Sequence, residues 1–212
     1  MQAIVVQDRD AGLAGLSLTE LPYPHAAENE VIVGVHAAGL TLGELAWEGT
    51  WTDRGGRDRT PSVPGHEGSG VVSELGYGTT GLTVGQRVFG LGDWACDGTL
   101  AEYVAIEARN LAPLPVGVDH AVAAGAVISG LTAWQALFDH AHLLAGQTAL
   151  AHGAAGGVGS IAVQLARQAG CRVIGPAGPP TETVRSISAS TGFWMWRLTA
   201  WSTPARSTWC PT

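Results

Sequence analysis

Short segments of alternating or continuous apolar residues dominate the first half of the chain. The clearest are 3–6 (AIVV), 31–39 (VIVGVHAAG), 68–75 (GSGVVSEL), 86–91 (QRVFGL) and 101–108 (AEYVAIEA). Clusters of Gly, Pro, Asn and Asp separate these segments. Such runs, bounded by turn residues, are typical of β-strands. We therefore predict a small β-barrel or sandwich in residues 1–118.

The pattern changes at about Asp119, where a long Ala-rich stretch with helical spacing begins. Asp119 is suited to cap the N-terminus of a helix, and Gly125 and Gly130 are expected to interrupt the helical stretch. His140 and His142 are expected to be exposed at its end. No apolar run is expected to reach membrane-spanning length.

A strand, a glycine turn, a helix and a second strand follow in order. The strand is predicted at 148–151, the helix at 158–169 and the second strand at 171–174, with Gly170 ending the helix. This is one βαβ unit. Parallel strands need neighbours and covered faces, so we predict an α/β domain that starts with residues 119–175.

The turn between strand and helix, 152–159 (HGAAGGVG), carries the most informative chemistry. Gly156 and Gly159 leave room for a phosphate and for close contact between helix and strand. The amides that open the helix present N–H groups and a positive dipole end to an anion. We predict a pyrophosphate-binding turn, although a glycine turn also occurs for steric reasons alone. The predicted cofactor-binding residues here are Ala155, Gly156, Gly157, Val158 and Gly159.

Composition and charge narrow the function classes. The net charge of −7 argues against nucleic acid or an anionic membrane as a partner. The three cysteines, Cys96, Cys171 and Cys210, have neither metal-ligand spacing nor the density of a disulfide framework. Cys171 is expected to be a small core residue. The N-terminus lacks the pattern of a secretory signal, so a cytoplasmic protein is expected.

Residues 176–212 differ from the rest of the chain. They hold four of the eight Trp residues and one acid, Glu182, together with Pro clusters and Ser/Thr runs. A change of composition inside an expected array of strands and helices conflicts with a consistent fold. We predict that this tail is not natively folded.

Six motifs occur in order along residues 1–175: AAGLTLGEL (37–45), PGHEGSGVV (64–72), VGQRVFGL (84–91), GTLAEYVAI (98–106), SGLTAWQAL (129–137) and HGAAGGVGSIAVQLAR (152–167). Together they resemble the zinc-independent branch of the medium-chain dehydrogenases/reductases, the quinone oxidoreductase or zeta-crystallin-like group. The resemblance implies a GroES-like β-barrel domain, an incomplete Rossmann doubly wound domain, and NADPH-dependent reduction of a quinone, enone or related carbonyl. Full-length relatives are expected to be homodimers. Ala154 stands where a first Gly is usual, which this branch accepts.

The segment PGHEGSG also resembles the zinc signature of alcohol dehydrogenases. A catalytic zinc needs three protein ligands, and Thr41 matches the position of the first Cys ligand in that lineage. We therefore predict no metal site. His66 and Glu67 are instead expected to hold the turn and the wall of the cleft by hydrogen bonds. Zinc-dependent alcohol oxidation remains a distant alternative.

The resemblance implies roles for two threonines. Thr41 is expected near the substrate and the nicotinamide, and Thr132 near the nicotinamide ribose or ring. A hydroxyl bonded back within its helix is the equally weighted alternative for Thr132. Trp47, Trp51 and Trp94 are candidates for an apolar substrate pocket, with core packing as the alternative for each.

The end of the second strand is where such domains select NAD or NADP. After Gly175, itself a predicted cofactor contact, the chain continues PAGPP and the selecting residue is missing. We hypothesise a reading-frame shift near Gly175: read one nucleotide back, Phe193-Trp194 must encode Leu and Trp194-Met195 must encode Asp.

Two interpretations of the tail remain open. In the first, the reading frame has shifted, and permitted wobble bases let the tail encode a helix end, a strand, a loop and another strand. In the second, the Trp-rich tail is genuine. We expect weak cofactor binding and little or no catalysis from the 212 residues alone. The other functional hypothesis is a non-catalytic remnant of a disrupted gene.

Overall fold

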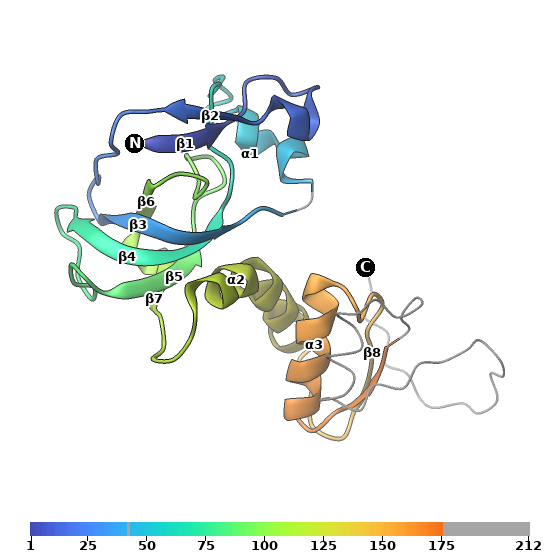
Figure 1. Ribbon diagram of the computed structural model, residues 1–212. Coiled ribbons are helices and arrows are strands. Elements are labelled where there is room, and N and C mark those ends of the chain that lie inside the picture. Colours follow the sequence, from blue (N-terminus) through green and yellow to red (C-terminus); the bar gives the residue numbers. More distant parts are fainter. Residues whose placement is uncertain (42, 176–212) are drawn as a thin grey trace. The chain divides into compact units, whose positions relative to one another are not determined.

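The computed structural model describes residues 1–41 and 43–175 (Figure 1). It divides into two compact units, Met1–Ile128 and a second unit that begins at Ser129. The first is rich in β-structure and the second is α/β, which confirms the predicted fold class. The predicted domain boundary at residues 118 and 119 stays a prediction. The predictions for 176–212 lie outside the described residues.

A five-stranded sheet forms the centre of the first unit, with the strand order β6-β3-β4-β5-β7 and every neighbouring pair antiparallel (Figure 1). Its longest members match predicted segments. Two other strands, β1 and β2, pair separately and antiparallel. The seven strands are β1 (Gln2–Val5), β2 (Ser17–Glu20), β3 (Glu30–Gly39), β4 (Glu67–Leu75), β5 (Arg87–Leu91), β6 (Tyr103–Glu107) and β7 (Leu111–Pro113).

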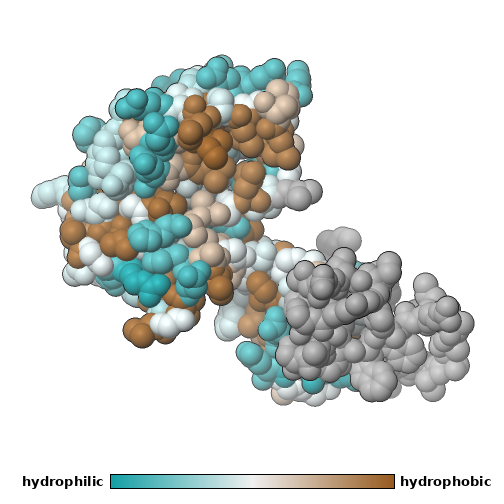
Figure 2. All heavy atoms as spheres, in the orientation of Figure 1, coloured by the Kyte–Doolittle hydropathy of each residue, from teal (hydrophilic) through white to brown (hydrophobic). Residues whose placement is uncertain are grey.

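The core of this unit follows from the alternation of its strands. In β5 and β6 every second residue is buried, as expected for strands with one face on a core. The main cluster comprises Val31, Val33, Val72, Leu82, Val88, Val104 and Ile106. Burying each of these side chains stabilises the fold by roughly 1.5–3 kcal/mol. Hydrophobic side chains also gather in patches on the visible surface among hydrophilic ones (Figure 2), and Leu13 and Leu18 are exposed.

Close approach of β3 and β4 depends on a glycine. A Cβ atom at Gly70 would lie 2.1 Å from the carbonyl oxygen of Gly34 in the neighbouring strand. Any other residue would push the two backbones apart. Short helices complete the unit: η1 (Gly12–Gly15), η2 (Glu44–Ala46), α1 (Glu48–Trp51) and η3 (Ala108–Asn110).

Helix α2 (His120–Trp134) begins as the sequence predicts. The Asp119 carboxylate accepts the N–H of Ala121 at 2.8 Å, which is an N-terminal cap. The expectation that Gly125 and Gly130 interrupt the helix is wrong, because α2 is continuous through both. Glycine lowers helix stability by about 1 kcal/mol, a cost that packing of one helix face outweighs. The buried residues on α2 are Ala123, Ala124, Val127 and Ala133.

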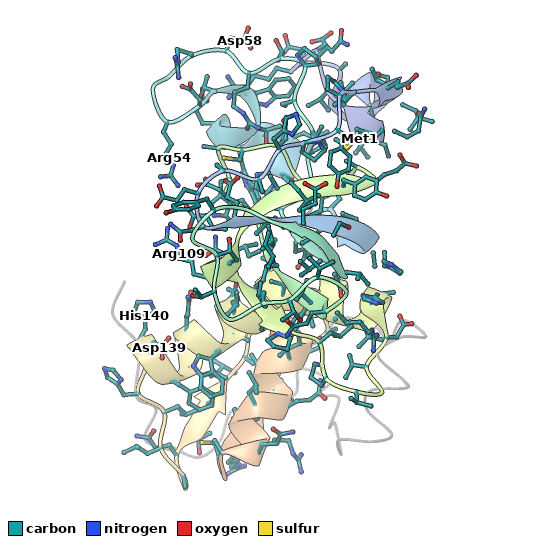
Figure 3. All side chains as sticks on the ribbon, turned by 90° about the vertical axis from the view of Figure 1, so that its left-hand side faces the viewer. Met1, Arg54, Asp58, Arg109, Asp139 and His140 are labelled. Carbon is teal, nitrogen blue, oxygen red and sulfur yellow. The ribbon has the colours of Figure 1, made fainter. Side chains whose placement is uncertain are left out.

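A π-helix, η4 (Gln135–His140), continues α2. The 21 residues His120–His140 are long and apolar enough to span a membrane by length and composition, so the expectation that no run reaches that length needs correction. A single such helix is weak evidence for a membrane span. His140 and His142 are exposed, as predicted, and Figure 3 shows Asp139 and His140 near each other at the edge of the second unit.

The predicted βαβ unit is present in the second unit. Strand β8 (Thr148–Leu150) pairs in parallel with β9 (Arg172–Ile174), and helix α3 (Gly157–Gln168) connects them. Gly170, at a φ of 80°, ends the helix. Cys171 is buried and its Sγ donates to the Leu144 carbonyl, which confirms its core role. Of the predicted doubly wound sheet, the described residues contain this first pair of parallel strands, β8 and β9.

Candidate functional site

The glycine turn before α3 is held by one tight backbone contact. Gly153 has a φ of 68°, and its carbonyl accepts the N–H of Gly156 at 2.8 Å. A Cβ atom at Gly159 would lie 2.1 Å from the same Gly153 oxygen. Glycine at 159 is therefore required for the first turn of α3 to pack against the preceding loop. Ala154, which replaces a usual glycine, is buried.

The start of α3 is suited to an anion. Its first turn carries no acidic residue, and the N–H groups of Gly157, Val158 and Gly159 have no carbonyl partner within the helix. These amides and the helix dipole together favour a phosphate group. The turn thus brings together the predicted residues from Ala155 to Gly159. Gly175 follows β9, whose Ile174 carbonyl accepts the N–H of Ala151.

A cavity of about 470 Å³ adjoins this turn. Small and apolar side chains line most of it, so a large planar group can approach the backbone closely. The lining residues are Ala133, Ala136, Leu137, Ala149, Leu150, Ala151, His152, Gly153, Gly156, Gly157, Val158, Gly159, Ala162, Ala166 and Val173.

In the first unit, a buried pair lies beside β4. The Nδ1 of His66 lies 2.7 Å from the Oε1 of Glu44, and both residues are 1% exposed. The same carboxylate accepts the backbone N–H groups of Gly65 and Thr41, at 2.5 and 3.1 Å. The Nε2 of His66 lies 3.1 Å from the Trp94 carbonyl oxygen. The hydrogen bonds predicted for His66 are therefore present.

The ionisation of Glu44 follows from its partners. Burial opposes ionisation of Glu44, but the hydrogen bonds from His66, Gly65 and Thr41 outweigh it and lower the pKa of that carboxyl. Both ring nitrogens of His66 face oxygen atoms, Nδ1 that of the Glu44 carboxylate and Nε2 that of the Trp94 carbonyl. A metal ligand needs a free ring nitrogen, and both nitrogens of His66 have a partner.

Glu67, which was predicted together with His66 to form structural hydrogen bonds, does so with a different partner. Its Oε2 accepts the N–H of Ile128 in α2 at 2.8 Å. Burial raises the pKa of Glu67, an effect that the Ile128 N–H opposes and the charge of Glu44 increases. Its predicted structural role is present as a contact between β4 and α2.

The structure brings together two of the three candidate tryptophans. The rings of Trp47 and Trp94 meet edge-on, with centroids 4.7 Å apart and an interplanar angle of 83°. The His66 ring stacks on Trp94 at 4.8 Å and 19°. Trp51 is buried and donates its Nε1–H to the Leu45 carbonyl, which is the core-packing alternative.

The predicted threonines belong to different units. Thr41 lies in the first unit, before η2, with its N–H bonded to Glu44. Thr132 lies on α2 in the second unit, and its side chain is exposed. Their catalytic roles stay predictions.

A second polar network was not predicted from the sequence. His120, the first residue of α2, donates Nδ1–H to the Ser69 hydroxyl at 2.7 Å and accepts the Arg87 Nε–H at 3.2 Å. The Ser69 hydroxyl in turn donates to the Val88 carbonyl. His36 stacks on His120 with centroids 4.6 Å apart.

Glu44 was also missed. A glutamate in a short loop is usually exposed, and only the fold brings it beside a histidine that is distant in the sequence. A signal was available in retrospect, because His66 in a turn without metal ligands needs hydrogen-bond partners for both nitrogens.

Comparison with known proteins finds a similarity in the first unit. Residues 27–116 match the alcohol dehydrogenase GroES-like domain. NorB, a spectinabilin polyketide synthase protein of Streptomyces orinoci, is 37% identical over 177 residues, which are 81% of this chain and 8% of that protein.

Two further relatives agree. The phthioceranic/hydroxyphthioceranic acid synthase of Mycobacterium tuberculosis is 39% identical over 128 residues, or 58% of this chain and 6% of the synthase. The quinone oxidoreductase of Pseudomonas syringae pv. Tomato DC3000 is 28% identical, with a TM-score of 0.77 over 89% of this chain and 56% of that one. These likenesses support the medium-chain dehydrogenase/reductase superfamily.

The chain spans less than a tenth of these curated relatives and a little over half of that quinone oxidoreductase.

Proposed function

We propose that this chain supplies the substrate-binding domain and the diphosphate-binding turn of an NADPH-dependent oxidoreductase. Its substrate is a quinone, an enone or a related conjugated carbonyl, such as an unsaturated thioester. The GroES-like domain followed by a glycine turn and a βαβ unit supports an oxidoreductase of the medium-chain superfamily. The choice of NADPH, the substrate class and the independence from zinc are our proposals.

The glycine turn carries this proposal. A backbone that tolerates only glycine at 159, followed by three helix N–H groups without internal partners, fits a diphosphate. The adjoining cavity of about 470 Å³ leaves room next to it. When bound, the nicotinamide cofactor supplies the hydride for reduction.

The residues of this chain are proposed to bind the diphosphate and to orient the reacting groups. Gly157, Val158 and Gly159 hold the diphosphate through their N–H groups. Thr41 and Thr132 are proposed to orient the reacting groups by hydrogen bonds, and a donor that polarises a carbonyl stabilises the charge that develops on its oxygen. A proton then comes from solvent or from a nearby hydroxyl. Trp47 and Trp94 are proposed to contact the substrate.

Zinc is not required for these steps. The zinc signature would use His66 as a ligand, but its two ring nitrogens already contact Glu44 and the Trp94 carbonyl. Thr41 is a poor substitute for a cysteine thiolate as a zinc ligand. The alternative of zinc-dependent alcohol oxidation predicts bound metal, which elemental analysis of the purified protein detects.

Conjugated thioesters are included among the substrates because the curated relatives named above are a polyketide synthase protein and a phthioceranic/hydroxyphthioceranic acid synthase. The Pseudomonas relative is a quinone oxidoreductase. We propose a cytoplasmic protein that acts on a small molecule, with no nucleic-acid or membrane partner, and with homodimers in the full-length form.

The decisive experiment measures binding of NADPH to the purified chain and its oxidation with a benzoquinone, an enone, an enoyl thioester and a simple alcohol. We expect weak NADPH binding, at most slow reduction of a conjugated carbonyl, and no reaction with the alcohol in the presence of NADP. The remnant hypothesis predicts neither binding nor turnover. Absence of NADPH binding, or alcohol oxidation that needs zinc, would contradict the proposal.

A further inference from the structure

A continuous line of hydrogen bonds joins Thr41 to Trp94. It runs from the Thr41 N–H to the Glu44 carboxylate (3.1 Å), from there to the His66 ring (2.7 Å), and on to the Trp94 carbonyl (3.1 Å). Glu44 also holds the Gly65 N–H at 2.5 Å. Three loops of the first unit are thereby fixed to one buried, hydrogen-bonded pair of side chains.

The pair has no exposed surface with which to act directly. Glu44 and His66 are each 1% exposed, whereas the residue at the end of the line, Trp94, is 39% exposed. Removing either side chain would leave buried polar atoms of the other without a hydrogen-bond partner, which the loops would have to relieve by moving. The position of Trp94 therefore depends on Glu44 and His66.

Ring contacts fix the orientation of the Trp94 indole as well as its backbone. His66 stacks on it at 4.8 Å with an angle of 19°, and Trp47 meets it edge-on at 4.7 Å. A Cβ atom at Gly49 would lie 2.5 Å from the Trp94 carbonyl, so α1 packs directly against this backbone. The indole is thus held on several sides while part of it stays accessible to solvent.

We propose that Glu44 and His66 are positioning residues that hold Trp94 at nearly a right angle to Trp47, so that the two indoles form an aromatic wall for a planar conjugated substrate. This inference rests on the proposed function. Indole rings favour flat π-systems in offset or edge-on contact, so a quinone ring fits such a wall better than a saturated chain does. Trp51 takes no part because it is buried in the core.

The positioning role has a test that needs no turnover. The chain is labelled with fluorotryptophan, and the Trp94 resonance is assigned by its loss in Trp94→Phe. His66→Phe keeps an aromatic ring next to Trp94 but removes both N–H groups, and Glu44→Gln keeps an acceptor oxygen but removes the charge. We expect the Trp94 resonance to shift or broaden in both variants. Tyr77→Phe, a change at an exposed site, is the matched control and leaves the resonance unchanged.

The role in substrate binding is measured by equilibrium dialysis with a naphthoquinone. Loss of an aromatic contact weakens binding by about 2- to 12-fold, and we expect this range for Trp94→Ala, His66→Phe and Glu44→Gln. Trp94→Ala leaves the buried pair intact, so it reports on the wall even where His66→Phe fails to fold.

Two results would overturn the inference. One is an unchanged Trp94 resonance in His66→Phe and Glu44→Gln. The other is a naphthoquinone affinity that is zero in the wild type or equal in wild type and Trp94→Ala. Failure of the proposed function has a separate signature, the absence of NADPH binding, which does not affect the fluorine spectra.

Discussion

At the scale of single residues, the hydrogen-bond partners of a histidine decide its charge. His120 donates to Ser69 and accepts from Arg87, whose guanidinium has only protons to offer. A second proton on His120 would meet that guanidinium N–H and would lie beside His36. His66 has different partners, since its two ring nitrogens face the Glu44 carboxylate and the Trp94 carbonyl oxygen.

Acid is therefore expected to destabilise the first unit through His120. Burial lowers the pKa of His120, and the charge of Arg87 and the neighbouring His36 lower it further, while Asp119 opposes them. Because the folded pKa lies below the unfolded value of 6.5, the unfolded state takes up the proton first. The stabilisation is complete above pH 6.5 and is lost as the pH falls below it.

Denaturant unfolding at pH 7.5 and at pH 5.5 measures this effect. We expect the free energy of unfolding of the wild type to decrease over this range, and that of His120→Gln to decrease less, since glutamine does not titrate. His140→Gln, at an exposed position, serves as the control with wild-type behaviour. An equal decrease in His120→Gln and the wild type would refute the assignment.

At the scale of elements, the same residue type has opposite effects in two helices. Gly159 lies in the first turn of α3, where a Cβ atom would lie 2.1 Å from the Gly153 carbonyl oxygen. A Cβ atom at Gly130 in α2 would have no atom within 4 Å. Glycine is therefore required at 159 by the contact with the turn, whereas at 130 alanine would fit and would make the helix more stable.

Paired alanine substitutions test this difference. Gly159→Ala is expected to lower the free energy of unfolding by roughly 1–3 kcal/mol, because the backbone must move. Gly130→Ala is expected to raise it by about 0.5–1 kcal/mol through helix propensity. Chemical denaturation of both variants provides the measurement. Destabilisation by Gly130→Ala would show that an unrecognised contact requires glycine there, and neutrality of Gly159→Ala would show that the turn is looser than described.

At the scale of the whole molecule, the sequence predicts what local patterns control. Strands β5 and β6 are recognised because one buried face imposes a period of two, and β3 and β4 because they hold short apolar runs. The βαβ unit is recognised because a glycine turn separates two apolar strands. Strand β7 (Leu111–Pro113) is missed because three residues ending in proline carry no period. The error over Gly125 and Gly130 has a different cause, since tertiary packing overrides local propensity.

The candidate site also has a part that local sequence predicts and a part that it does not. The predicted turn from Ala155 to Gly159 forms because its spacing is local. The link from Glu44 to His66 joins residues 22 positions apart, and the link from His66 to Trp94 joins residues 28 positions apart. No local pattern encodes such contacts, because they arise only when the strands of the sheet have brought their loops together.

The most direct test of cofactor binding at the glycine turn is thermal unfolding of the chain with NADPH, NADH and nicotinamide mononucleotide. A ligand that binds only the folded state raises the melting temperature, by the equivalent of about 2.7 kcal/mol at a concentration 100 times its Kd. We expect both dinucleotides to raise it and the mononucleotide, which lacks the diphosphate, to have little effect. No rise with either dinucleotide at millimolar concentration, or an equal rise with the mononucleotide, would contradict diphosphate binding by residues 155–159.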